Sequence, residues 1–240
     1  METPTDIKIY SILKKYLPAI TDEQVHLIQN YHTLLLDWNQ KINLVSRKEE
    51  ESIWSRHVIG SISFLFQFGI EPFSEVVDIG TGGGLPGIPM AILYPGAKFV
   101  LIDSIKKKTM AVEEMAKALK LPNVEVVWGR AEELSQYREF QHAFDYIVSR
   151  AVAPVRDIMK WCKPFIRKSD ADAVKLEAGA KTNTRLIGKG TYVFLKGGDL
   201  TDEISHAKIK FKPADIQMFE MPLLTEIPEI TDKRLIVIKP

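Results

Sequence analysis

Several kinds of feature are scarce or missing in this sequence of 240 residues. Cys162 is its only cysteine, which excludes an intramolecular disulfide and a zinc site built from several cysteines. The sequence has no run of about 18 apolar residues, and its first residues lack an apolar core followed by a small-residue cleavage site. We therefore expect a cytoplasmic protein without a membrane span.

A surplus of charge of one sign is also missing. The chain has 32 basic and 31 acidic residues and a net charge of +1, which argues against indiscriminate coating of nucleic acid but leaves room for a local basic face. With 45% apolar and 26% charged residues, the composition is typical of a globular chain that buries a sizeable core. The length fits one large domain, or one domain with a small appendage.

Residues 1–70 are predicted to form a helical N-terminal segment. Thr21 and Gln24 have the spacing of a capping box, and apolar residues then recur at helical spacing. A similar helical pattern covers residues 50–68. Between the two patterns, residues 38–46 (WNQKINLVS) break the periodicity and predict a turn.

Residues 71–240 have the pattern of an α/β domain. Alternating strands and helices favour a doubly wound, mostly parallel sheet that is covered on both faces and binds its ligand at the carboxyl ends of the strands. Two strands near 208–219 and 234–239 predict a hairpin that places one antiparallel strand in the sheet. The polar stretch 167–190 predicts a long surface loop. The remaining predicted strands are Glu75–Ile79, Lys98–Ile102, Val124–Trp128, Phe144–Val148 and Thr191–Lys196.

A glycine-rich loop follows the first of these strands, and three kinds of ligand compete for it. A triphosphate loop needs a Gly-Lys-Ser/Thr ending, but no lysine lies between Asp78 and Gly96. A dinucleotide loop fits only if its count starts at Gly82, three residues after the strand. The pattern acid-x-Gly-x-Gly-x-Gly is met directly and resembles motif I of class I S-adenosylmethionine-dependent methyltransferases, in which an acid suits a ligand that carries an ammonium and a sulfonium. Its members here are Asp78, Gly80, Gly82 and Gly84.

Two further elements support a nucleoside ligand. Asp103 ends the second strand, where a carboxylate can accept hydrogen bonds from ribose hydroxyls, although NAD-binding proteins use the same device. Residues 129–132 (GRAE) follow the third strand, at the place where methyltransferases contact adenine. Each element alone could be a structural turn or cap, but the three in order at strand ends favour a methyltransferase.

The residues after the fourth strand bear on the target atom. Ser149-Arg150-Ala151 is not the Asn/Asp-Pro-Pro-aromatic motif of enzymes that methylate exocyclic amines, and it offers no acid for the base of a ribose methyltransferase. Cys162 lies in a predicted helix, so we expect buried packing there and no pyrimidine C5 chemistry. Guanine N7 has a lone pair and no proton to lose, so in-line placement without a general base could supply most of the acceleration.

The sequence resembles the RsmG family, also called GidB, from about residue 20 to the C-terminus. The resemblance implies a class I methyltransferase fold after a small helical segment, and methyl transfer to guanine N7 in small-subunit (16S) ribosomal RNA. It also implies contacts to S-adenosyl-L-methionine from Gly80, Leu85, Ala131, Glu132 and Arg150, to which the arguments above add Gly82 and Asp103. The motifs that carry it are WNQKINLVS, SRHVIGS, VVDIGTGGGLPGIP, LIDSIKKK, GRAEE, SRAVAP, FLKGG and RLIVIKP.

The sequence departs from the family pattern at three places. Gly60 stands where the family often has an aspartate, which puts any role of that acid in doubt. Gly83 stands where proline or alanine is frequent, and we expect it to loosen the loop slightly. The stretch 167–190 is longer than in many relatives, and we expect it to touch RNA or ribosomal protein.

Basic residues near the predicted ligand edge are candidate contacts to RNA, although a charge run is as often a solvated face. Three lysines at 106–108 oppose the dipole of the helix that they begin, which suggests phosphate binding. Lysines 208, 210 and 212 would protect an edge strand from pairing. His57 could instead hydrogen-bond in the core, and Arg150 could stack on a base or orient the cofactor. The candidate RNA contacts are Arg56, His57, Lys106, Lys107 and Lys196.

We thus expect a monomeric RNA methyltransferase that uses S-adenosyl-L-methionine, needs no metal, and acts on 16S ribosomal RNA or the small ribosomal subunit. The alternatives are a methyltransferase for another RNA atom, an NAD enzyme, and a ribosome-assembly factor that binds the cofactor without turnover.

Overall fold

Seven strands form the central sheet of the computed structural model, which describes residues 3–46, 52–176, 185–221, 227 and 233–240. Their order is β4-β3-β2-β5-β8-β10-β9. All neighbouring strands are parallel except β10, which is antiparallel to both β8 and β9. The predicted sheet with one antiparallel strand is confirmed. The seven strands are β2 (Glu75–Ile79), β3 (Lys98–Asp103), β4 (Val124–Trp128), β5 (Tyr146–Arg150), β8 (Thr191–Gly197), β9 (Asp215–Glu220) and β10 (Lys233–Lys239).

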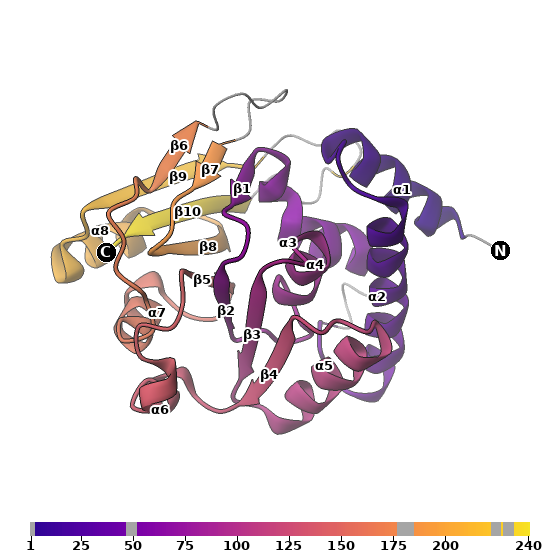
Figure 1. The fold of residues 1–240 in the computed structure, drawn as a ribbon, viewed down its shortest axis with the longest axis horizontal. Helices are drawn as coiled ribbons and strands as arrows, with labels where there is room; N and C mark the ends of the chain where they lie inside the picture. Colours follow the sequence, from indigo (N-terminus) through magenta and orange to yellow (C-terminus); the bar gives the residue numbers. More distant parts are fainter. Residues whose placement is uncertain (1–2, 47–51, 177–184, 222–226, 228–232) are drawn as a thin grey trace.

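Alternate residues of the strands face two separate cores, because successive side chains of a strand point to opposite faces. Val76 packs into the core beneath α1, α2, α4 and α5, whereas Val77 packs into the core beneath α6, α7 and α8. Figure 1 shows these two helical layers on either side of the sheet. The helices are α1 (Pro4–Tyr16), α2 (Asp22–Lys41), α3 (Gly60–Ile62), α4 (Gly87–Leu93), α5 (Lys106–Ala118), α6 (Ala131–Leu134), α7 (Val155–Cys162) and α8 (Thr201–Phe211).

The chain order reverses beside β2. β3 and β4 lie on one side of β2, and β5 and β8 lie on the other. The carboxyl ends of the strands at such a reversal form the crevice in which doubly wound folds bind ligands. The loop after β2 and the loop after β5 therefore face each other across this crevice.

The N-terminal segment is helical, as predicted, and shares one apolar core with the sheet. The capping box of α2 is confirmed, because Thr21 accepts from the Gln24 amide and the Gln24 side chain accepts from Thr21. The turn predicted from residue 38 begins later, since α2 continues to Lys41. Ile53–Ile59 then form a π-helical turn and Ser63–Phe66 a 3₁₀ turn. The division at residue 70 stays a prediction.

Three short strands form a second sheet that the sequence analysis did not predict. β1 (Phe68–Ile70) lies within the segment predicted to be helical, and β6 (Val174–Leu176) and β7 (Arg185–Ile187) lie within the stretch predicted to be a loop. Their order is β1-β7-β6. The three-residue strands were too short for an alternating pattern to be visible in the sequence. The tip of the predicted loop, 177–184, lies outside the described residues.

Helix α8 corrects the prediction of an edge strand over lysines 208–212. Asp202 and Glu203 occupy its first turn, Lys208 and Lys210 its last, and Lys212 caps it in the left-handed conformation. This charge order favours a helix because it complements the helix dipole. The edge strand begins later, at Asp215, and pairs with β10 as a hairpin partner, as predicted.

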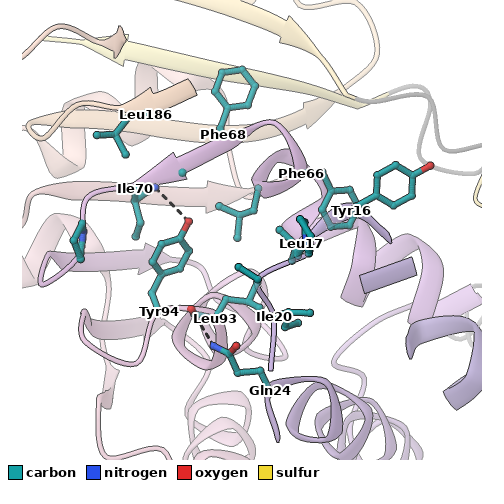
Figure 2. Close-up of a pocket in the computed structure, with 15 residues that line it drawn as sticks. Tyr16, Leu17, Ile20, Gln24, Phe66, Phe68, Ile70, Leu93, Tyr94 and Leu186 are labelled. Carbon is teal, nitrogen blue, oxygen red and sulfur yellow. Dashed lines mark hydrogen bonds between the residues drawn. The ribbon is translucent and has the colours of Figure 1, made fainter. Parts of the chain in front are cut away.

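An apolar cavity of about 410 Å³ lies between α1, α4, β1 and β7. Figure 2 shows two of its polar side chains bonded within the protein: the Gln24 amide donates to the Leu93 carbonyl (3.2 Å), and the Tyr94 hydroxyl accepts from the Ile70 amide (3.4 Å). No charged side chain of the described residues lines it. It shares no lining residue with the crevice at the strand ends, so we place the functional site at the crevice.

Cys162 is fully buried in α7, as predicted, and burial raises the pKa of its thiol well above the usual value. None of the described helices is long and apolar enough to cross a membrane.

Candidate functional site

Gly80 and Gly82, in the glycine loop after β2, are glycines for different reasons. Gly80 has a φ of +68°, and a Cβ there would lie 2.4 Å from a methyl group of Val152. Gly82 has a φ of +59°, but a Cβ there would meet only a backbone oxygen at 3.9 Å. Gly80 therefore packs closely against the loop after β5, whereas the space above Gly82 is open to a ligand.

Asp78 organises this loop from behind and does not face the ligand, which corrects the interpretation of it as a partner for a cationic ligand. It is fully buried and accepts from the Thr81 hydroxyl (2.7 Å) and the Gly87 amide (3.0 Å). Burial raises its pKa to about 7, against the opposing effect of these two hydrogen bonds. Its Oδ1 atom has no hydrogen-bond partner. Both facts favour the neutral acid, which needs less solvation than a carboxylate.

Helix α2 holds the loop from the other side. The buried Tyr31 hydroxyl donates to the Gly83 carbonyl at 2.8 Å. A Cβ on Gly83 would lie 2.8 Å from Leu35 and 3.4 Å from Leu44. Glycine at this position therefore admits close packing against the N-terminal segment, and the slight loosening of the loop expected from Gly83 stays a prediction.

Asp103, at the end of β3, joins two loops. Its carboxylate accepts from the Gly82 amide and from the Ile105 amide, both at 2.9 Å, and the residue is 6% exposed. Each carboxylate oxygen can accept more than one hydrogen bond. Asp103 can therefore hold the glycine loop and still accept from a ligand.

Two adjoining cavities lie at this crevice. The first, of about 420 Å³, lies over the glycine loop and Leu85, and the second, of about 180 Å³, lies beside the loop after β4. The second is lined by Gly129, Arg130, Ala131 and Glu132 among others. Both are lined by Gly80, Asp103, Ser104 and Val152. The structure thus brings all seven predicted cofactor residues to these two adjoining cavities: Gly80, Gly82, Leu85, Asp103, Ala131, Glu132 and Arg150.

A third cavity, of about 250 Å³, adjoins the first at Arg150 and Ala151. Arg150 Nη2 lies 3.1 Å from His57 Nδ1, and its Nη1 donates to the Arg56 carbonyl at 3.5 Å. Arg150 therefore lies between the two spaces and ties the π-helical turn to the end of β5. The other lining residues are Gly60, Leu195, Lys196, Gly197 and Lys233.

The candidate RNA residues fall into two groups. Arg56, His57 and Lys196 line the third cavity, whereas Lys106 and Lys107 are exposed at the start of α5. Lys196 is held within the protein, because its ammonium donates to the Ala153 carbonyl (2.8 Å) and pairs with Glu203. Glu203 also accepts from the Val155 amide. These contacts fix the loop that carries Val152.

Some lining residues were missed by sequence reasoning. Leu44, Val45 and Ser46 line the first cavity, and the Asn39 side chain accepts from the Leu44 and Val45 amides at 3.0 and 2.9 Å. The available signal was the motif WNQKINLVS, which was interpreted as a turn and as a family motif but not as part of the ligand site. Lys108 also lines this cavity. Among the residues that the structure describes, no cluster of three or more side chains could hold a metal ion.

Comparisons with known proteins show the family of this chain. The chain matches the family model "GidB: rRNA small subunit methyltransferase G" over residues 24–231. It is 39% identical over 193 residues to the ribosomal RNA small subunit methyltransferase G of Christiangramia forsetii, covering 80% of this chain and 82% of that one. It is 40% identical over 190 residues to the protein of the same name from Flavobacterium johnsoniae, covering 79% and 81%.

The fold is similar to that of a solved methyltransferase. Aeropyrum pernix fibrillarin, in complex with natively bound S-adenosyl-L-methionine, matches with a TM-score of 0.50 and 11% identity, covering 70% of this chain and 67% of that one. At this identity the likeness shows the fold alone, and it confirms the class I methyltransferase fold. With the family match over most of its length, the chain belongs to the GidB family of rRNA small subunit methyltransferase G proteins.

Proposed function

We propose that this protein transfers a methyl group from S-adenosyl-L-methionine to N7 of a guanine in small-subunit (16S) ribosomal RNA. The observation that carries the proposal is the third cavity, which adjoins the first at Arg150 and Ala151. Basic side chains line it, and no Asp or Glu of the described residues does. Such a space suits a nucleotide of an anionic RNA and offers no carboxylate for proton transfer.

The first two cavities fit the cofactor. The open space above Gly82 lets a ligand approach bare backbone, and Asp103 offers carboxylate oxygens where the two cavities meet. Gly80, Gly82, Leu85 and Arg150 would hold the end of the cofactor in the first cavity, and Ala131 and Glu132 would hold the end in the second. When bound, the cofactor supplies an electrophilic methyl group on a positively charged sulfur.

The residues at the junction bind and orient. Ser149 does not serve as a base in this proposal, because its buried hydroxyl donates to the Ile79 carbonyl at 2.9 Å. Arg150 is held against His57, so its guanidinium is oriented at the junction of the two spaces. Guanine N7 needs no deprotonation, and holding the reactants in line could contribute roughly 7–11 kcal/mol to the acceleration.

Other basic residues would contact RNA around this junction. Lys106 and Lys107 would neutralise phosphates at the rim, because both are exposed. Arg56, His57 and Lys196 would border the target nucleotide. The substrate is ribosomal RNA, so we also propose a cytoplasmic location. The monomeric state stays a prediction.

The test is methyl transfer from labelled S-adenosyl-L-methionine to small ribosomal subunits that lack this modification, with the product nucleoside identified by mass spectrometry. We expect 7-methylguanosine. Transfer to another nucleoside would refute the target atom. Cofactor binding without any transfer to subunits would refute the enzyme assignment and favour an assembly factor.

A further inference from the structure

Trp128 is an exposed aromatic residue at the end of β4, one of the two edge strands of the central sheet. Trp128 is 57% exposed, although tryptophan is highly buried on average. Its indole N–H donates to the Ser104 carbonyl at 3.1 Å, so its only polar group is satisfied within the protein. What the residue presents outward is therefore aromatic surface.

One cation lies over this ring, and two more follow it in the sequence. The Lys106 ammonium lies 5.1 Å from the centroid of the Trp128 ring. Lys106, Lys107 and Lys108 form the first turn of α5, which contains no acid and has no side-chain cap. Helices usually begin with acidic residues, and cations there oppose the helix dipole. The charges therefore do not serve the helix, and a ligand with negative charge would account for them.

The ring lies at the rim of the cofactor cavities. Ser104, whose carbonyl holds the indole, lines both of them. Gly129 and Arg130, which follow Trp128 directly, line the second. A ligand that enters the crevice thus passes close to an aromatic surface with an ammonium beside it.

We propose that Trp128 and Lys106 form a stacking platform for an unpaired base that flanks the target guanine. The inference rests on the proposed function and deepens it. Single-stranded nucleic acids are held by bases stacked on aromatic rings and by cations near their phosphates. A guanine can reach the cofactor only when it leaves its own stack, and its neighbours are then free to stack on protein.

The test compares Trp128→Ala and Trp128→Phe with the wild type. The matched control is Phe73→Ala, because Phe73 is an aromatic residue that is 80% exposed and lies just before β2, at the amino end of the strands, whereas Trp128 lies at a carboxyl end. Equilibrium binding to unmodified small subunits and to extracted 16S RNA is measured alongside binding of S-adenosyl-L-methionine. We expect Trp128→Ala to weaken RNA binding about tenfold, Trp128→Phe to retain most of it, and Phe73→Ala to change nothing. Cofactor affinity should be unchanged in all three.

Three results would overturn the platform. The first is subunit binding by Trp128→Ala that equals that of the wild type. The second is an equal loss of cofactor affinity, which would make the contact to Ser104 structural. The third is that Trp128→Ala binds subunits more weakly than the wild type but binds extracted RNA as well as the wild type does. That result would assign the surface to a ribosomal protein.

The platform and the proposed function fail separately. Weaker binding by Trp128→Ala, together with absence of 7-methylguanosine from the wild-type reaction, would keep the platform and reject the function. Normal 7-methylguanosine formation by the wild type, together with unchanged RNA binding by Trp128→Ala, would keep the proposed function and reject the platform.

Discussion

Replacement of Asp78 by asparagine should change how the stability of the protein depends on pH. The native carboxyl is fully buried, and burial raises its pKa from 3.8 to about 7. In Asp78→Asn the amide oxygen can still accept from Thr81 and Gly87, which now bond to one carboxyl oxygen. The variant therefore keeps the hydrogen bonds of the loop but no longer titrates.

The sign follows from proton binding. Between pH values of about 4 and 7 the native wild type holds a proton on Asp78 that the unfolded chain has released, so the free energy of unfolding falls as pH rises. Below the unfolded pKa both states are protonated and the effect vanishes. From about pH 5 to about pH 8, linkage gives a loss of roughly 2–3 kcal/mol from this one group.

Urea unfolding of the wild type and Asp78→Asn over this pH range measures the effect, because other titrating groups cancel in the difference. We expect the variant to gain roughly 2–3 kcal/mol relative to the wild type between the two ends of the range. Thr81→Val is the matched control, since it removes one hydrogen bond to the carboxyl but keeps the titrating group. Parallel curves for the wild type and Asp78→Asn would refute a protonated Asp78.

Four further substitutions test the site. Gly80→Arg should abolish cofactor binding, because the side chain would collide with the loop after β5. Asp103→Ala should severely weaken cofactor binding while the protein stays folded. Wild-type affinity of a folded Asp103→Ala protein, measured by calorimetric titration, would refute the assignment of Asp103 to the ribose hydroxyls. Tyr31→Phe should lower the free energy of unfolding by about 1–2 kcal/mol and weaken cofactor binding, since it leaves the buried Gly83 carbonyl without its donor; unchanged denaturation and titration curves would contradict the anchoring role. Glu203→Gln should lower the free energy of unfolding by about 2 kcal/mol and should also lower kcat/KM for subunits. Values equal to those of the wild type would show that the loop carrying Val152 does not need the contacts of Glu203.

The central sheet was predictable because its strands are long enough to show an apolar pattern and most of its parallel strands are followed by a segment of helical length. The positions of Asp103 and residues 129–132 at the ligand crevice were predictable, because these residues lie at the carboxyl ends of strands. β6 and β7 were not predictable, since three-residue strands have no visible period. Helix α8 was missed because alternating lysines at 208, 210 and 212 also fit an edge strand.

Burial and tertiary contacts limited the prediction of the site. A sequence does not show that Asp78 lies behind its loop or that a leucine of α2 occupies the space left by Gly83. Lys196 was chosen as an RNA contact for its charge and position, and its pairing with Glu203 depends on a helix that was not predicted. Trp128 was seen only as the end of a strand.

The contact between Tyr31 and Gly83 couples helix α2 to events in the cofactor cavity. None of residues 22–41, all of which are described, lines that cavity, yet the helix and the glycine loop share a hydrogen bond and close packing. Coupling of this kind is reciprocal. A ligand at about 100 times its Kd stabilises the native state by about 2.7 kcal/mol, and part of that should appear as slower amide hydrogen exchange in α2. In the reverse direction, a substitution that frays α2 will lower cofactor affinity from a distance.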